Sequence, residues 1–173
     1  LDDPSKHRTW ILPSFAHPVG TSSMVPGSGN SHRRTMERYA NLAVFTAMIH
    51  DLSCGEVSPR GAMGVSISYW PNEGDRRELA FGLWASVKLL FAAGAKRVMI
   101  PTQSPINLTI DDDIDALKNF EVKKGDIDVV AVHPMASVSM GDDPQRSPIR
   151  SDGQHHQIEN LFVADGSLFP TSI

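Results

Sequence analysis

Residues 75–94 read DRRELAFGLWASVKLLFAAG and carry the strongest helical pattern of the chain. Apolar side chains recur there at a spacing of three to four residues, which places them on one face of an α-helix. These residues are Leu79, Leu83, Val87 and Leu90, with Ala80, Trp84 and Phe91 widening the stripe. Asp75 and Glu78 place negative charge in the first turn, where it favours the helix dipole, and Gly94 is a natural stop. We therefore expect a helix from Asp75 to Gly94.

The two apolar segments before this helix favour strands. Residues 39–52 are dense in apolar side chains; helix and strand both fit, but the β-branched and aromatic residues and the break at 53–55 favour a strand. Residues 65–70 alternate apolar and polar side chains, as a half-buried strand does. We expect these two strands to pair in an antiparallel sheet with one solvated face.

Shorter elements follow the helix. Residues 95–101 are predicted to form a short strand, and residues 111–120 a second helix that three aspartates open. Residues 127–132 are predicted to form a strand that runs into His133, and a buried strand from Asn160 is predicted to end in a turn at Asp165 and Gly166.

Composition excludes several classes of protein. The chain has 173 residues, 40% of them hydrophobic and 21% charged, so wholesale disorder is not expected. A formal net charge of −4 argues against a nucleic-acid surface, and no apolar run reaches the roughly 18 residues that span a bilayer. The single cysteine excludes an internal disulfide framework and a cysteine-rich zinc site.

The start of the chain is predicted to be irregular. Residues 1–38 contain four prolines and a flexible Gly-Ser-Gly-Asn-Ser stretch at 27–31. The chain begins at Leu1 without methionine and stops at Ile173 just after an apolar run, so we interpret it as a piece of a larger protein. No Gly-x-Gly-x-x-Gly opens a strand–helix unit, so this chain is not expected to contain a complete dinucleotide-binding fold.

His133 is the first candidate for chemistry. It follows an apolar run and precedes Pro134, which disfavours a helical conformation at His133 and fixes the exit of the chain. An imidazole held in a dry pocket can take a proton near neutral pH, although a structural histidine is the default interpretation. Nothing around Ser137 and Ser139 matches the Gly-x-Ser-x-Gly of a serine hydrolase.

Metal binding is not predicted. His155 and His156 are adjacent, and neighbouring side chains of an extended segment point to opposite faces. The three aspartates at 111–113 lack the rest of a calcium-loop pattern. His50 and Asp51 could form an acid–base pair, but a surface pair at a strand end is the preferred interpretation.

Two segments resemble a known family. Residues 133–141, HPMASVSMG, resemble the His-Pro-x-Gly-x-Cys-Arg-Met-Gly motif of the glucose–methanol–choline (GMC) flavin oxidoreductases, and residues 159–172, ENLFVADGSLFPTS, are very similar to the C-terminal signature of that family. Residues 89–95 and 152–154 are similar to the long-chain alcohol oxidase branch.

This resemblance implies an FAD enzyme that oxidises an alcohol to an aldehyde or ketone. The implied fold class is α+β: residues 39–141 would form the substrate-binding domain, an antiparallel sheet flanked by helices. Residues 142–173 would return, through a final strand, to an FAD-binding domain that lies mostly N-terminal to this chain. The implied partners are a small-molecule alcohol and that N-terminal FAD-binding part of the same protein.

The resemblance also assigns site residues. His133 matches the active-site histidine beside the flavin, which receives or stabilises the hydroxyl proton as hydride leaves the carbon. Asp165 and Gly166 match the turn that contacts FAD, and Pro134 and Met135 would lie over the flavin edge. The second active-site residue of the family falls beyond Ile173, so this chain alone is expected to be inactive.

The match departs from the family motif at three positions. Ala136, Val138 and Ser139 replace the usual Gly, Cys and Arg. One alternative is therefore a binding protein on the same fold that has lost catalysis, and another is a structural fragment without FAD.

Overall fold

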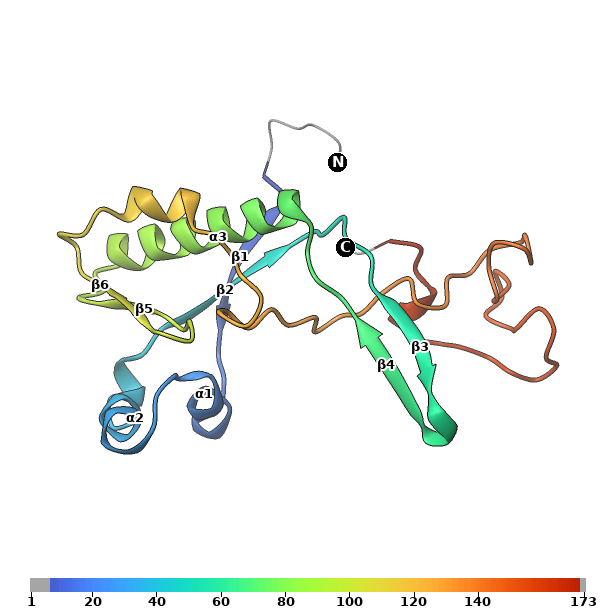
Figure 1. Cartoon of the computed structure of the whole chain (residues 1–173), viewed down its shortest axis with the longest axis horizontal. Helices are drawn as coiled ribbons and strands as arrows, with labels where there is room; N and C mark the ends of the chain where they lie inside the picture. Colours follow the sequence, from blue (N-terminus) through green and yellow to red (C-terminus); the bar gives the residue numbers. More distant parts are fainter. Residues whose placement is uncertain (1–6, 172–173) are drawn as a thin grey trace. The chain divides into compact units, whose positions relative to one another are not determined.

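The computed structural model describes residues 7–171, which divide into two compact units. Unit 1 comprises Leu1–Cys54 and Trp70–Asp128, and unit 2 comprises Gly55–Tyr69 and Val129–Ile173. The described residues form helices and three two-stranded antiparallel sheets, which confirms the α+β class (Figure 1). The sheets are small ribbons rather than one continuous sheet.

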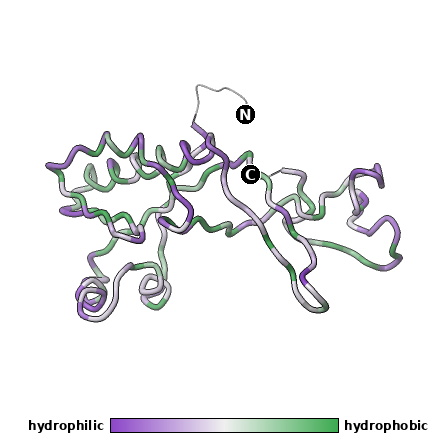
Figure 2. Tube along the Cα trace, viewed as in Figure 1, coloured by the Kyte–Doolittle hydropathy of each residue, from purple (hydrophilic) through white to green (hydrophobic). Residues whose placement is uncertain are grey.

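Helix α3, Glu73–Ala92, is the central element of unit 1 and confirms the predicted helix. The Asn72 side chain caps its start by accepting a hydrogen bond from the Asp75 N–H at 2.9 Å. Gly94 follows its end with φ of +92°, a left-handed conformation that glycine adopts without strain. In Figure 2 the tube of α3 changes from hydrophilic at its first turn to mainly hydrophobic toward its end.

One face of α3 covers the β1–β2 ribbon of unit 1. Strand β1, Thr9–Ser14, pairs with β2, Val44–Ile49, from Thr9 opposite Ile49 to Ser14 opposite Val44. The contact with α3 is close at Gly82, where a Cβ would lie 2.6 Å from the Cβ of Ala47. Strand β2 confirms the preference for a strand within residues 39–52, but its partner was not predicted.

The prediction that residues 1–38 are irregular is wrong within residues 7–38, and residues 1–6 lie outside the described residues. Besides β1, this region holds α1, Pro18–Met24, and α2, Gly29–Met36. The His17 cap followed by Pro18 at the first position of α1 is a recognisable helix start. The N–H at that position has no acceptor within a helix, so proline, which lacks this N–H, loses no hydrogen bond there. A short 3-10 helix, Tyr39–Asn41, then leads into β2.

The predicted pairing of residues 39–52 with residues 65–70 is also wrong. Strand β4, Gly64–Ser68, pairs with β3, Glu56–Arg60, in a hairpin of unit 2 that turns through Gly61–Met63. Gly61 has φ of +63°, which allows this local turn. Within the described chain the strand is not half-buried, since Val65 is 66% exposed and Ile67 is 71% exposed.

The core of unit 1 lies between α3 and the segments that follow it. Strands β5, Val98–Ile100, and β6, Ile106–Leu108, form the third ribbon, and η3, Ile114–Asn119, lies along α3 (Figure 1). Their buried side chains form one cluster: Val87, Phe91, Val98, Ile100 and Leu117. The element predicted as a helix over 111–120 is this shorter 3-10 helix, because Asp112 bonds back to Thr109 and Asp113 caps the turn.

Two other predicted strands are not present. Residues 127–132 are irregular except for single bridges from Ile127 to Thr102 and Lys124, and Val132 is 75% exposed. Within residues 160–171 there is only one bridge, between Phe162 and Gln154, and Phe162 is 60% exposed. An apolar run forms a strand only where another strand pairs with it, and neither run has such a partner among the described residues.

Ala136 has an unusual backbone conformation in unit 2. Its φ is +62°, in the left-handed region where a side chain is strained and glycine is not. The adjoining backbone is nevertheless ordered, since the Val138 N–H donates to Ser167 O at 3.1 Å and the Met140 N–H donates to Leu168 O at 2.9 Å. These two bonds hold the left-handed residue in place.

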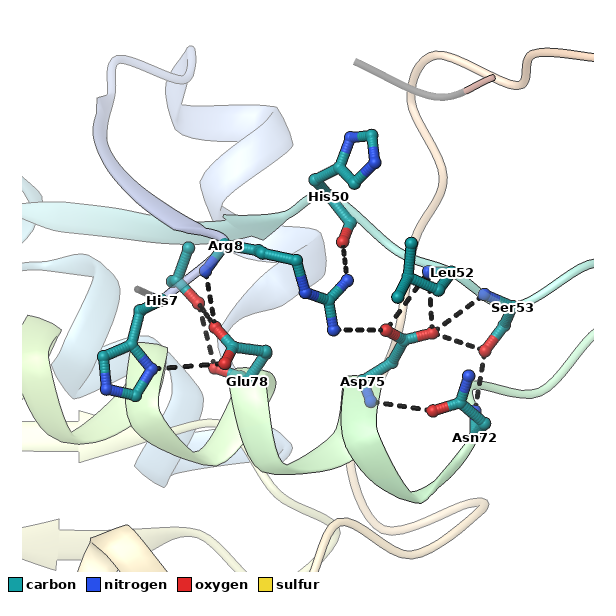
Figure 3. Close-up of polar contacts among 9 residues, drawn as sticks. His7, Arg8, His50, Leu52, Ser53, Asn72, Asp75 and Glu78 are labelled. Atoms are coloured by element: carbon teal, nitrogen blue, oxygen red, sulfur yellow. Dashed lines mark hydrogen bonds and ion pairs between the residues drawn. The ribbon is translucent and has the colours of Figure 1, made fainter. Parts of the chain in front are cut away.

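A buried carboxylate joins three segments of unit 1 (Figure 3). Asp75 is 0% exposed and sits in the first turn of α3. It accepts hydrogen bonds from Arg8 Nη2 at 3.0 Å, Leu52 N at 3.0 Å and Ser53 N at 2.9 Å. A second Arg8 nitrogen donates to the His50 carbonyl. The carboxylate therefore connects the segments before β1 and after β2 to the start of α3.

Hydrogen bonding controls the pKa of both acidic residues in this region. Burial alone would raise the pKa of Asp75, but the Ser53 hydroxyl, the Leu52 N–H and Arg8 outweigh it and lower the pKa below 3.8. Burial would likewise raise the pKa of Glu78, but the Arg8 N–H, Thr9 and His7 lower it below 4.5. Both carboxylates are therefore held in the charged form.

We expect Asp75→Asn to destabilise unit 1 by about 3 kcal/mol, because it removes the charge that compensates the partly buried Arg8 guanidinium. All three tryptophans, Trp10, Trp70 and Trp84, belong to unit 1. Urea unfolding followed by tryptophan fluorescence therefore reports this unit. Asp111→Asn is the matched control and should change the midpoint little; equal effects of both variants would contradict the role of Asp75.

The lowered pKa values also predict acid sensitivity. A carboxylate whose folded-state pKa lies below its unfolded value adds stability above the unfolded pKa and loses it as the pH falls through the folded pKa. The urea midpoint of unit 1 should therefore hold down to about pH 4.5 and fall progressively below it. The fall should be smaller in Asp75→Asn, which keeps only Glu78; an identical pH profile would exclude Asp75 as a source.

We expect Ala136→Gly to stabilise unit 2 locally by about 1 kcal/mol, because glycine adopts positive φ without a Cβ clash. Hydrogen exchange at the Val138 and Met140 amides should slow by about fivefold. Ala164→Gly is the matched control in the same unit, has no positive φ, and should speed exchange or leave it unchanged. Faster exchange in Ala136→Gly would show that the left-handed residue is not strained.

Candidate functional site

Most of the site residues expected from the sequence meet at one corner of unit 2. The backbone of residues 136–141 runs beside residues 165–168, and two hydrogen bonds join them, from Val138 N to Ser167 O and from Met140 N to Leu168 O. A Cβ built on Gly166 would lie 3.5 Å from the Pro134 carbonyl oxygen and 3.9 Å from Met135 Cγ. Pro134 and Met135 therefore contact the turn that Asp165 and Gly166 form, which we call the Asp165–Gly166 corner.

The Asp165 side chain shapes this corner. It caps the 3-10 turn η4, Gly166–Leu168, and its Oδ1 accepts from the Ser167 N–H at 2.8 Å. The Ser167 hydroxyl and N–H lower the pKa of Asp165, so the carboxylate is charged at neutral pH. Among the described residues no group bonds Oδ2, so this exposed acceptor is available to a ligand.

His133 lies at the entrance to the same corner, directly before Pro134. Its side chain is exposed within this chain, so the dry pocket expected around it is not formed by the described residues. The strand expected to deliver it is also missing, because residues 129–132 are irregular. No described residue forms a hydrogen bond with the ring, which leaves both ring nitrogens free to meet a substrate.

Ala136 accounts for one departure from the family motif. It stands where the motif has glycine, and its φ of +62° is the conformation for which glycine is suited. The segment thus has a left-handed residue at the position where the motif has glycine, although that residue is alanine here. The substitutions at Val138 and Ser139 leave the main-chain bond from Val138 intact but remove the thiol and the positive charge.

A second set of contacts, from Ile149 and His156, holds the end of residues 136–141 in place. The Gly141 N–H donates to the Ile149 carbonyl at 2.8 Å, and Ile149 is 1% exposed. His156 Nε2 lies 2.9 Å from the Gly141 carbonyl oxygen and donates to it. The sequence did not predict the bond between the His156 side chain and the Gly141 backbone, because the two residues lie fifteen positions apart and no spacing pattern links them.

The two adjacent histidines thus have separate structural roles. His155 Nδ1 accepts N–H bonds from Gln157 at 3.0 Å and Ile158 at 3.1 Å, whereas His156 bonds Gly141. Within residues 7–171 no three His, Cys, Asp or Glu side chains group as metal ligands. In the same part of the chain no helix is both long and apolar enough to cross a bilayer.

The corner suits a ligand that offers hydroxyl or N–H donors. The free Asp165 oxygen is a charged acceptor, and Gly166 adds no side chain that would keep a ligand away from the backbone. Pro134 and Met135 supply apolar surface beside these groups. A flavin nucleotide has ribityl hydroxyls, ring N–H groups and a flat apolar edge, so these residues fit the cofactor that the resemblance implies.

Comparison with known proteins identifies relatives of the whole chain. The family model of the GMC oxidoreductase C-terminal domain matches residues 52–173. An uncharacterised GMC-type oxidoreductase of Mycobacterium tuberculosis is 32% identical over 165 residues, covering 93% of this chain and 25% of the relative. Two long-chain-alcohol oxidases of Arabidopsis thaliana are each 27% identical, covering 91% and 100% of this chain and 22% and 24% of the relatives.

The chain spans about a quarter of the length of these curated relatives. No solved structure matches it significantly. The family model covers more than half of the chain, including both segments of the corner. The chain therefore belongs to the GMC oxidoreductase family.

Proposed function

We propose that this chain is the C-terminal part of an FAD-dependent oxidoreductase that oxidises an alcohol to an aldehyde or ketone. Membership of the GMC oxidoreductase family supports an oxidoreductase, and the relatives named long-chain-alcohol oxidases support an alcohol as substrate. The observation that carries the proposal is the corner itself. Two segments about thirty positions apart, each resembling a family signature, are hydrogen-bonded to one another.

Each residue of the corner has a proposed role. His133 accepts or stabilises the hydroxyl proton of the alcohol, because an imidazole can take up a proton near neutral pH. Asp165 accepts hydrogen bonds from the cofactor through its free oxygen, and Gly166 allows the cofactor to approach the backbone. Pro134 and Met135 line the flavin edge. FAD, when bound, supplies the group that accepts hydride from the substrate carbon.

The remainder of the enzyme is proposed to lie outside this chain. FAD would be bound mainly by an N-terminal domain, residues 39–141 would belong to the substrate-binding domain, and residues 142–173 would return toward FAD. The relatives are about four times as long as this chain, which supports a larger protein in which another domain binds FAD. We also propose that a second active-site residue follows Ile173 and that the 173-residue chain by itself does not oxidise alcohols.

The test of His133 uses the full-length protein. We expect His133→Ala to slow alcohol-dependent flavin reduction by about 10²–10⁴-fold, the usual effect of losing a general base. Stopped-flow absorbance of the flavin measures this directly. His50→Ala is the matched control, because the hydrogen bonds of His50 in unit 1 use its backbone N–H and carbonyl, which alanine keeps, and it should reduce the rate little. A loss below tenfold in His133→Ala would overturn the catalytic role.

The substitutions at Val138 and Ser139 favour a second candidate function. A protein that keeps the Asp165–Gly166 corner but lacks the motif's charge would bind a ligand without oxidising it. Full-length spectra separate the two candidates, since a flavin band that bleaches on addition of an alcohol supports the oxidoreductase. A stable band with saturable ligand-induced shifts supports the binding protein.

A further inference from the structure

A shallow depression in unit 2 lies apart from the residues assigned to flavin and alcohol. Two segments line it, residues 144–148 and residues 155–157, and it has a volume of about 250 Å³. The segments are tied together by the His156 N–H, which donates to the Pro148 carbonyl at 3.0 Å. The volume lies below the usual 300–1,000 Å³ of pockets for drug-sized molecules, so the depression suits a small ligand.

The first segment is a turn that Asp143 holds. The Asp143 carbonyl accepts from the Arg146 N–H at 3.0 Å and from the Ser147 N–H at 2.9 Å. The Asp143 carboxylate accepts from the Gln145 N–H at 3.0 Å and does not line the depression. The turn thus presents the Arg146 side chain on a fixed backbone.

The second segment presents an oriented imidazole. Because His155 Nδ1 accepts from the N–H groups of Gln157 and Ile158, the proton of the neutral ring lies on Nε2. In the described part of the chain, that N–H has no acceptor and Arg146 has no carboxylate partner. The neighbouring His156 is different, since its Nε2–H already bonds the Gly141 carbonyl.

The charge of the depression has one sign. Arg146 contributes a permanent positive charge, and none of the residues that line the depression is acidic. The nearby Arg150 does not add to it, because Asp152 neutralises that guanidinium. Arg146 and His155 thus offer N–H donors that no described residue accepts, and no carboxylate lines the depression, which is the chemistry that recognises an oxyanion.

From these contacts we infer that the depression between residues 144–148 and 155–157 binds a small oxyanion, a phosphate or carboxylate group. Arg146 supplies the charge and His155 an N–H donor. The inference is independent of the proposed flavin chemistry, because it uses none of the residues of the Asp165–Gly166 corner.

The test is a titration of the ¹⁵N-labelled 173-residue chain with sodium phosphate, and separately with sodium acetate, at constant ionic strength made up with sodium chloride. We expect saturable shifts of the Arg146, Ser147 and Gln157 amides in at least one of the two titrations, with a Kd on the order of 1 mM, as suits a site open to solvent. Saturation by phosphate alone would assign a phosphate site, and saturation by acetate alone a carboxylate site.

Two variants complete the test. Arg146→Gln should weaken binding at least tenfold, whereas Arg34→Gln, which removes an equally exposed charge from α2 in unit 1, should leave the Kd unchanged. Shifts that stay linear for both anions, that appear equally with chloride, or that survive in Arg146→Gln would mean nonspecific anion binding only and would overturn the inference.

Discussion

The fold of unit 1 depends on one buried carboxylate. Asp75 is fixed by the first turn of α3, and its two oxygens satisfy donors from the segments before β1 and after β2. A buried charge is tolerated only when it is paired and hydrogen-bonded, so its partners must stay where they are. The same contacts fix the ends of the β1–β2 ribbon relative to α3. The apolar cluster forms elsewhere on this helix, where β5 and η3 pack against it.

The corner in unit 2 is built differently, because main-chain bonds join its two segments and the Asp165 and His156 side chains support them. The amides of Val138 and Met140 bond residues 167 and 168, and Gly141 is bonded on both its N–H and its carbonyl. Side-chain identity is therefore less critical there than backbone shape. This explains how the segment keeps its position beside Asp165 although three residues of the family motif have changed.

The sequence predicts local structure better than it predicts pairing. Helix α3 was predictable because its periodicity, its acidic first turn and Gly94 all agree. The β1–β2 pairing joins residues 30 to 40 positions apart, and no local sequence pattern marks it. The β3–β4 hairpin was missed because its turn contains no Asn-Gly signal. The apolar runs at 127–132 and after Asn160 resemble strands in composition but have no strand beside them in the described chain. The positions of Asp165, Gly166, Pro134 and Met135 were expected from the resemblance alone, whereas the support from His156 depends on a contact between distant residues.

The left-handed alanine at position 136 has a consequence for how such chains are recognised. Glycine, asparagine and aspartate reach this conformation readily and alanine reaches it under strain, but valine, isoleucine and threonine scarcely reach it at all. The φ angle at this position therefore limits the residues that fit without severe strain to a small set, of which glycine is only one member. A sequence pattern that requires glycine at this position would miss a chain such as this one, whereas a profile that also accepts the other members of the set would find it.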